Sequence, residues 1–102
     1  MELSVYERLI LLNILPPEGD FTTLKIVRQL KSDLSFSEDE HAALQFRQEE
    51  GRVEWRSEAD LPKDISIGEK ATDIIVGVLK DLNDKKKLTN EHYSIYEKFI
   101  GE

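Results

Sequence analysis

The sequence predicts a mainly helical α+β domain that carries a small antiparallel β-hairpin. Two observations point to this class. Apolar residues recur at intervals of three and four over several segments, as they do on the buried face of a helix. Between Leu44 and Arg56 the interval changes to two, which is typical of a strand with one buried face. A chain of 102 residues has the usual size of one domain, so we expect residues 1–102 to form a single domain.

Helix starts are marked by residues that can cap free backbone N–H groups. Three predicted helix starts carry the motif Ser-x-x-Glu, in which the serine hydroxyl accepts from the backbone and the glutamate reaches back to the serine N–H. These boxes begin at Ser4, Ser37 and Ser66. Asp20 and Thr89 can cap two further helices. Together with the apolar spacing, these signals predict helices over residues 5–15, 21–33, 38–43, 67–83 and 90–100.

The first predicted helix is apolar around almost its whole circumference. Such a helix either lies at the centre of the fold or turns one side towards a second subunit, and Leu11 is the residue we expect in that interface. Pro16 ends the helix, because the residue before a proline avoids helical geometry. Pro-Pro-Glu-Gly then forms a tight corner before the next helix.

The second predicted helix is expected to bury an apolar stripe and to expose a basic one. The stripe expected in the core consists of Phe21, Leu24, Val27, Leu30 and Leu34. The opposite side, expected to face solvent, carries Lys25, Arg28 and Lys31.

The alternating segment is predicted to form the hairpin, and its apolar pattern decides the length of the loop. A three-residue loop would place Phe46 opposite a glutamate and would split the apolar face. A four-residue loop over residues 48–51 places Phe46 opposite Val53, and Leu44 then lies opposite Trp55. That loop also ends on a glycine, where a left-handed residue is usually needed. We therefore expect the four-residue loop.

The charge of the chain disfavours partners that are polyanions. With 21 acidic and 14 basic residues, the net charge is −7, which opposes binding to nucleic acid or to an anionic membrane surface. Residues 35–64 hold nine acidic and four basic side chains, a balance of −5. This segment includes the short third predicted helix, which carries Glu38-Asp39-Glu40. In a DNA-binding protein of this layout, that helix would have to approach the phosphates.

Two sets of candidate contact residues follow from the pattern. Trp55, with Arg52 and Arg56 beside it on a short hairpin, has the composition of a protein-interface anchor. The alternative rests on the order helix, helix, helix, hairpin, which matches a winged-helix layout. Nucleic-acid contacts would then come from Arg47, Arg52, Arg56, Lys85, Lys86 and Lys87. The lysine run is also explained by the negative end of a helix dipole.

The sequence offers no set of residues for catalysis or for a cofactor. Cysteine is absent, so disulfides and thiolate metal sites are excluded. The single Glu38-x-x-His41 pair lacks the second pair that a di-metal helical site needs. There is neither a Gly-x-Ser-x-Gly elbow nor a glycine-rich phosphate loop. We expect no metal, no cofactor and no enzymatic activity. The chain lacks an apolar run of about 20 residues and a basic leader, so we expect a cytoplasmic protein.

Several short segments, spread over most of the chain, resemble known sequences. They are Glu7-Arg8-Leu9, Leu12-Asn13-Ile14-Leu15-Pro16, Glu18-Gly19, Thr23-Leu24-Lys25-Ile26, Phe36-Ser37-Glu38, Glu69-Lys70-Ala71-Thr72-Asp73-Ile74-Ile75 and Tyr96-Glu97-Lys98-Phe99. With these segments the chain resembles a group of short hypothetical proteins that recur in bacteriophage and prophage genomes. The resemblance implies a phage or bacterial setting, and it transfers no site, ligand or reaction.

These observations predict a non-enzymatic protein-interaction module that acts as a phage accessory or adaptor protein, with a homodimer as one form of it. The alternative is a winged-helix-like nucleic-acid-binding or regulatory protein. A variant, an acidic mimic of nucleic acid that blocks a DNA-binding host protein, fits the charge of residues 35–64. The third hypothesis, an enzyme, comes last because the sequence offers no catalytic set.

Overall fold

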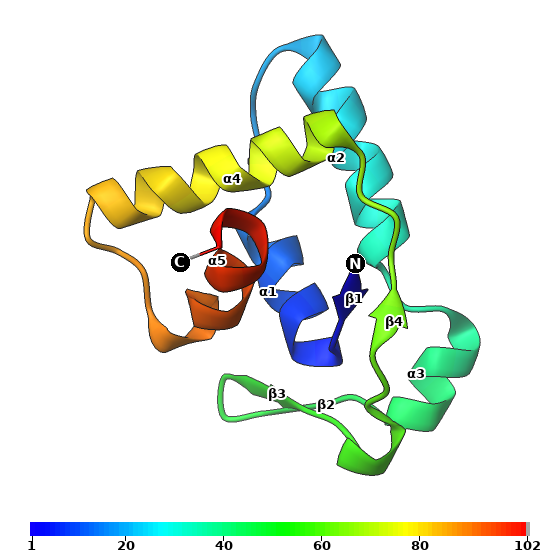
Figure 1. The fold of residues 1–102 in the computed structure, drawn as a ribbon. Helices are drawn as coiled ribbons and strands as arrows, with labels where there is room; N and C mark the ends of the chain where they lie inside the picture. Colours follow the sequence, from blue (N-terminus) through cyan, green and yellow to red (C-terminus); the bar gives the residue numbers. More distant parts are fainter. Residues whose placement is uncertain (102) are drawn as a thin grey trace.

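Helix α1 (Val5–Ile14) lies at the centre of the fold in the computed structural model, which describes residues 1–101. It is covered by α2 (Phe21–Leu34), α4 (Glu69–Asp84) and α5 (Tyr93–Ile100), as Figure 1 shows. The fully buried apolar side chains come from all of these helices and from the segments around them: Leu3, Val5, Leu11, Leu34, Leu44, Ile75, Leu79 and Ile95. Of the two positions expected for the first helix, the central one is confirmed.

The remaining elements are short and lie mostly at one end of the helical body. They are β1 (Glu2–Leu3), α3 (Glu38–Leu44), β2 (Arg47–Glu49), β3 (Arg52–Glu54), β4 (Lys63–Asp64) and two 3₁₀ turns, Ser57–Ala59 and Asn90–His92. Strand β1 pairs antiparallel with β4, and β2 pairs antiparallel with β3 in a separate sheet. The predicted class, a mainly helical α+β fold with a small hairpin, is confirmed.

Most of the expected helix caps are present. The Ser4 hydroxyl accepts from the backbone N–H of Glu7, whose carboxylate accepts from the N–H of Ser4. Ser37 and Glu40 make the same reciprocal pair at the start of α3. The Asp20 carboxylate accepts an N–H from the first turn of α2. Because these signals act within a few residues, they are reliable in the sequence alone.

The prediction of a third capping box at Ser66 is wrong. Helix α4 begins at Glu69, and its N-cap residue is Gly68, which has no side chain to accept a hydrogen bond. The reason lies in the preceding chain: β4 is paired with β1, and Ile65 is buried in the core immediately after it. This tertiary anchoring keeps the chain extended past Ser66, so the helix starts later than the local signal indicates.

The expected four-residue loop over residues 48–51 is also wrong. Arg47 pairs with Glu54 across the ladder, so that only Glu50 and Gly51 remain in the turn. Both have positive φ, 49° and 79°, as a type I′ turn requires. Such a turn twists in the same sense as the strands it joins, which makes two-residue hairpins the commonest kind.

With the two-residue turn, the aromatic side chains of Phe46 and Trp55 lie on the same face of the hairpin. Continuing the observed register by one residue places Phe46 opposite Trp55, and their ring centroids are 6.1 Å apart. The three-residue and four-residue loops considered above are longer, and each of them pairs Phe46 with a different residue. The observed register therefore makes the two aromatic residues direct cross-strand neighbours, which the expected register does not.

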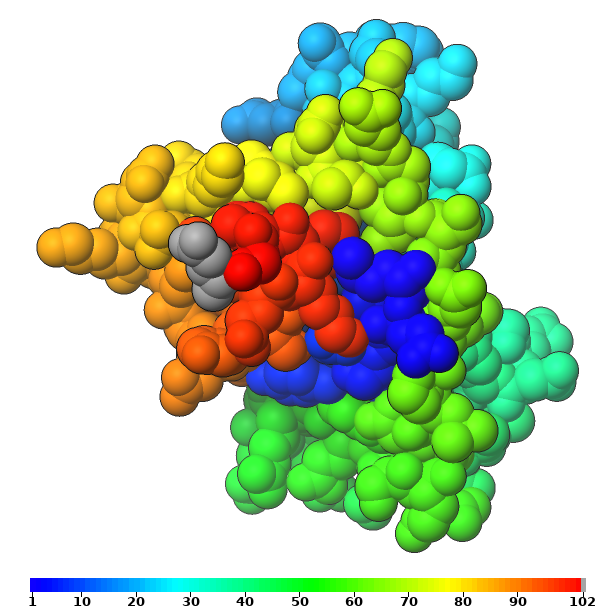
Figure 2. Space-filling model, in the orientation of Figure 1, coloured from blue at the N-terminus to red at the C-terminus, as the bar shows by residue number. Residues whose placement is uncertain are grey.

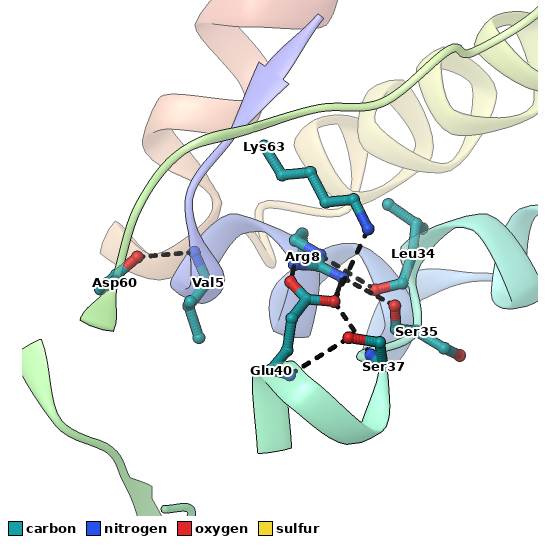
Figure 3. A network of polar contacts seen from close by, with 8 residues as sticks. All are labelled: Val5, Arg8, Leu34, Ser35, Ser37, Glu40, Asp60 and Lys63. Carbon is teal, nitrogen blue, oxygen red and sulfur yellow. Dashed lines mark hydrogen bonds and ion pairs between the residues drawn. The ribbon is translucent and has the colours of Figure 1, made fainter. Parts of the chain in front are cut away.

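A buried arginine joins α1 to the connection between α2 and α3 (Figure 3). The Arg8 side chain is only 1% exposed. Its Nε donates to the carbonyl of Leu34 at 3.1 Å, and Nη2 donates to that of Ser35 at 2.7 Å. Nη1 lies 2.6 Å from Oε2 of Glu40, and the guanidinium stacks over Phe36, 3.9 Å from the ring centroid. One side chain thus satisfies carbonyls at the end of α2 and fixes the start of α3.

Candidate functional site

Trp55, the expected interface anchor, is half-buried and holds the hairpin against α1. Its indole N–H donates to the carboxylate of Asp60 at 3.1 Å, and that carboxylate also accepts the backbone N–H of Val5 at 3.1 Å. The Trp55 ring lies between Tyr6 and Phe46, with centroid distances of 6.5 and 6.1 Å. Most of the hydrogen-bonding and packing capacity of Trp55 is used inside the molecule, which leaves less of it for a partner.

The arginines of the hairpin lie close together, but each one is next to a carboxylate. All of them are more than half exposed. The N···O distances are 3.4 Å for Arg47–Glu54, 3.5 Å for Arg52–Glu54 and 3.4 Å for Arg56–Glu58. Exposed pairs of this kind add little stability. They do neutralise the local charge, so the hairpin presents no concentrated positive surface.

The lysine run lies elsewhere on the molecule. Lys85, Lys86 and Lys87 follow α4 and are exposed, and Lys85 pairs with Asp81 at 3.0 Å. Figure 1 places this end of α4 well apart from β2 and β3. The cations proposed for nucleic-acid contact therefore do not converge into one strip.

Leu11, the fourth residue expected in a protein interface, is fully buried within the chain itself. That prediction is wrong, because α2, α4 and α5 of the same chain cover α1 on the sides that the sequence left open. The apolar circumference of the first helix is explained by its central position and requires no second subunit.

Two apolar residues of α2 that were predicted to lie in the core are exposed on the surface instead. Phe21 is 81% exposed and Leu24 is 40% exposed, whereas Val27, Leu30 and Leu34 are buried as expected. The reason is geometric. A helix turns about 100° per residue, so residues nine apart, such as Phe21 and Leu30, lie on roughly opposite sides. A stripe built only from steps of three drifts around the helix, and its first members leave the core.

The exposed side of α2 and the corner before it form a groove of about 450 Å³, called the α2 groove below. It is lined by Pro16, Pro17, Phe21, Leu24, Lys25, Val27, Arg28 and Lys31. The apolar residues of the corner and the first turn lie at one end. The basic residues continue along the helix, and none of them pairs with a carboxylate anywhere in residues 1–101.

The α2 groove is open because of where α4 begins. The start of α4, from Gly68 to Ala71, lies beside Ile26 and Leu30, in the middle of α2. The first turn of α2 extends beyond that crossing, and Figure 1 shows it projecting from the body of the fold. Figure 2 shows the same end standing out at the top of the molecule. No element of the described chain covers Phe21.

The most buried carboxylate, Glu7, has its hydrogen-bonding capacity filled. It accepts from the N–H of Ser4 at 3.0 Å, from Nζ of Lys98 at 2.7 Å and from the hydroxyl of Ser94 at 2.8 Å. Burial raises the pKa of Glu7, but the hydrogen bonds from these donors outweigh it and the net pKa is lowered. A carboxylate held in its ionised form acts here as a structural link between α1 and α5.

His41, considered above as a metal ligand with Glu38, packs its ring near Phe36 and Phe46, with centroid distances of 6.0 and 5.5 Å. No group of three or more potential metal-ligating side chains is found within residues 1–101. Over the same range, no helix is long and apolar enough to cross a membrane.

Comparison with models of protein families, with curated proteins and with solved structures finds no match to this chain. The α2 groove, where exposed apolar side chains and unpaired cations lie together, is the candidate functional site.

Proposed function

We propose that this protein is a non-enzymatic protein-interaction module that binds its partner through the α2 groove. The observation that carries the proposal is the exposure of Phe21, which leaves 81% of its surface in water beside a half-exposed Leu24. Burying a phenylalanine side chain contributes about 1.5–3 kcal/mol, which a partner would gain by covering it. Exposed apolar patches with a polar rim are typical of interaction sites.

The resemblance to phage and prophage proteins supplies the setting of this proposal. The module would act as an accessory or adaptor protein in the cytoplasm of a bacterial host cell. A helix that presents an exposed aromatic side chain in a groove suits this role, because a few well-placed anchors carry most of the affinity of an interface.

A homodimer is the less favoured form of the module. The first helix is apolar around most of its circumference, which favours a dimer, but Leu11 at the centre of that surface is buried within the chain. Sedimentation of the purified protein at several concentrations tests the point, and we expect a monomer.

The alternative, a nucleic-acid-binding protein, is favoured by one observation: Lys25, Arg28 and Lys31 lie unpaired on the helix that follows a tight corner. Against it stand the net charge of −7 and the separation of the other basic residues. Titration with duplex DNA at about 50 mM salt, where electrostatic affinity is high, decides between the two, and we expect no binding.

Affinity capture from an extract of the native host tests the main proposal. Three baits are compared: the unchanged protein, Phe21→Ser and, as a matched control, Tyr93→Ser. Tyr93 is 67% exposed but lies on α5, outside the α2 groove. We expect a protein that is retained by the unchanged bait and by Tyr93→Ser, and lost with Phe21→Ser. Retention of the same proteins by all three baits would contradict the proposal.

A further inference from the structure

Resting on the proposed function, we infer that the α2 groove binds an acidic amphipathic segment of another protein. A large apolar side chain of that segment packs beside Phe21 and Leu24, and its carboxylates pair with the cations farther along the helix. The distribution of charge on the protein points to this class of partner.

The α2 groove places three unpaired cations beside exposed apolar side chains. Seven of the fourteen basic side chains, those of the hairpin among them, lie within 4.0 Å of a carboxylate oxygen. Lys70, Lys80, Lys86 and Lys87 do not do so within residues 1–101, but they lie outside the α2 groove. Lys25, Arg28 and Lys31 have no such partner in residues 1–101, and their spacing of three places them near one another on the same side of α2. In a protein of net charge −7, an unpaired basic cluster is a place for carboxylates from outside.

Two acidic residues lie between Pro17 and Phe21 in the sequence, and neither of them lines the α2 groove. Glu18 is exposed on the corner. Asp20 accepts the N–H of Thr23 at 2.8 Å, and this hydrogen bond from Thr23 lowers its pKa. The carboxylate of Asp20 is thus engaged at the helix start, and the basic cluster is left without a partner from this corner.

The α2 groove has a direction, which sets the order of residues in its partner. Pro16, Pro17 and Phe21 form the apolar end, and Lys31 lies ten residues farther along α2. Ten residues of helix span about 15 Å, which is close to three turns. The partner segment therefore carries its apolar anchor at one end and carboxylates over the following two to three turns, or over the equivalent extended length.

A second copy of the same face is a poor occupant. Two α2 grooves placed against each other would bring two sets of three cations together, and like charges across an interface oppose association. A stable dimer usually uses about 20–30 residues on each side, far more than line this groove. Phosphate offers no counterpart for the apolar end, and the concave shape suits an inserted side chain better than a bilayer surface.

Nuclear magnetic resonance titration of the full, isotope-labelled chain tests the inference. The probe is a synthetic amphipathic peptide with leucines on one face and glutamates beside them. Matched peptides replace every glutamate by glutamine or by lysine. We expect the glutamate peptide to shift amide signals within residues 16–31, the glutamine peptide to bind about tenfold more weakly, and the lysine peptide not to bind.

Variants of the protein supply the second arm of the test. The double variant Lys25→Glu/Arg28→Glu is compared with Lys80→Glu/Lys87→Glu, which makes the same change in net charge at exposed positions on and after α4. We expect the first pair to weaken binding of the glutamate peptide by at least about tenfold, and the second pair to change it by about twofold or less. Circular dichroism of each variant confirms that it is folded.

The experiments distinguish failure of this inference from failure of the proposed function. Equal binding of the glutamate and glutamine peptides would overturn the acidic partner and leave the α2 groove as an apolar interaction site. Absence of shifts within residues 16–31 at about 1 mM glutamate peptide would also overturn the inference, while the capture experiment still judges the proposed function. Shifts of these residues by duplex DNA, or by phosphatidylserine-containing vesicles, in place of the peptide would overturn both.

Discussion

The side chains of Arg8 and Glu40, which are 32 residues apart in the sequence, meet in a two-pronged ion pair. Nη1 lies 2.6 Å from Oε2, and Nη2 lies 3.3 Å from Oε1. The arginine is buried, and the glutamate also accepts the N–H of Ser37 at the start of α3. The pair therefore connects the central helix to the cap of another helix, so that one bond contributes to both tertiary packing and local structure.

Removing one member of this pair should destabilise the fold strongly. Glu40→Ala leaves the Arg8 guanidinium buried without its carboxylate, and breaking a buried pair in this way costs about 3 kcal/mol. Urea unfolding followed by circular dichroism measures the loss. The exposed pair Arg56–Glu58 serves as the control, and Glu58→Ala should change the free energy of unfolding by less than about 0.5 kcal/mol. A loss below about 1 kcal/mol for Glu40→Ala would contradict the role given to the pair.

Acid should destabilise the protein over a defined range of pH. The hydrogen bond from Arg8 is the main cause that lowers the pKa of Glu40 from 4.5 to about 2. A lowered pKa in the folded state means that the stabilisation is complete above about pH 4.5 and is lost as the pH falls towards 2. The lowered pKa of Glu7 acts in the same direction. The midpoint of urea unfolding, measured at a series of pH values, should therefore fall across this range.

The variant Glu40→Gln isolates the contribution of Glu40 to that acid response. Glutamine keeps the size of the side chain and does not titrate, so the variant should start from a lower stability and lose less of it between pH 4.5 and 2. Parallel pH profiles for the variant and the unchanged protein would show that other groups are responsible.

Substitution of Phe21 should leave stability almost unchanged, although phenylalanine is usually a core residue. Phe21→Ser removes a side chain that is mostly in water, so the free energy of unfolding should change by less than about 0.5 kcal/mol. Leu34→Ala, in the same helix but fully buried, should cost about 3 kcal/mol. Thermal unfolding of the two variants compares them directly. Similar losses would mean that Phe21 is covered in solution.

The turn of the hairpin should respond to the residue type that it carries. Gly51 has a φ of 79°, so Gly51→Ala should destabilise the hairpin by about 1 kcal/mol. Glu50 also has a positive φ, and Glu50→Asn should stabilise the turn by about 0.5 kcal/mol, because Asn-Gly suits a type I′ turn. Hydrogen exchange of the amides in β2 and β3 measures both effects. Stabilisation by Gly51→Ala together with destabilisation by Glu50→Asn would favour a different loop.

The hydrogen bond between Trp55 and Asp60 should contribute to holding the hairpin on α1. Trp55→Phe removes the indole donor and should cost about 1 kcal/mol. Asp60→Ala also removes the acceptor for the N–H of Val5, so it should cost more, about 2 kcal/mol. Since Trp55 is the single tryptophan, its fluorescence reports the position of the hairpin in Asp60→Ala. An unchanged emission spectrum and unchanged stability would contradict this assignment.

The fold class and most helix starts were predictable, because the signals for them are local. Ser4, Asp20 and Ser37 cap helices through hydrogen bonds to residues only three positions away. The start of α4 was not predictable in this way, because the pairing of β4 with β1 involves residues 60 and 62 positions apart and overrides the local signal at Ser66.

The candidate site was missed because burial depends on which element covers a given face. Nothing in the sequence states that α4 begins beside the middle of α2 and leaves its first turn open. One signal was nevertheless present. Lys25 and Arg28 follow Phe21 by four and seven positions, a spacing that places all three on one side of a helix. The spacing to Lys25 and Arg28 predicts that Phe21 lies on the basic, exposed side of the helix, whereas the steps of three predict that it lies in the core.

Arg8 carried no comparable signal. It is three and seven positions before Leu11 and Leu15, and it shares their buried side of α1. A charged residue at such a position is usually assigned to solvent, and its partners Ser35 and Glu40 are too far along the chain for any local pattern to identify them.

The link between Glu7 and Lys98 has a consequence for how this chain reaches its native state during synthesis. Lys98 donates to the carboxylate of Glu7 and to the carbonyl of Glu2, across 91 and 96 residues. During synthesis, α1 therefore cannot obtain its final surroundings until α5 has emerged from the ribosome. A nascent chain arrested before residue 93 should remain open to proteases and chaperones, and release of α5 should close it in one cooperative step.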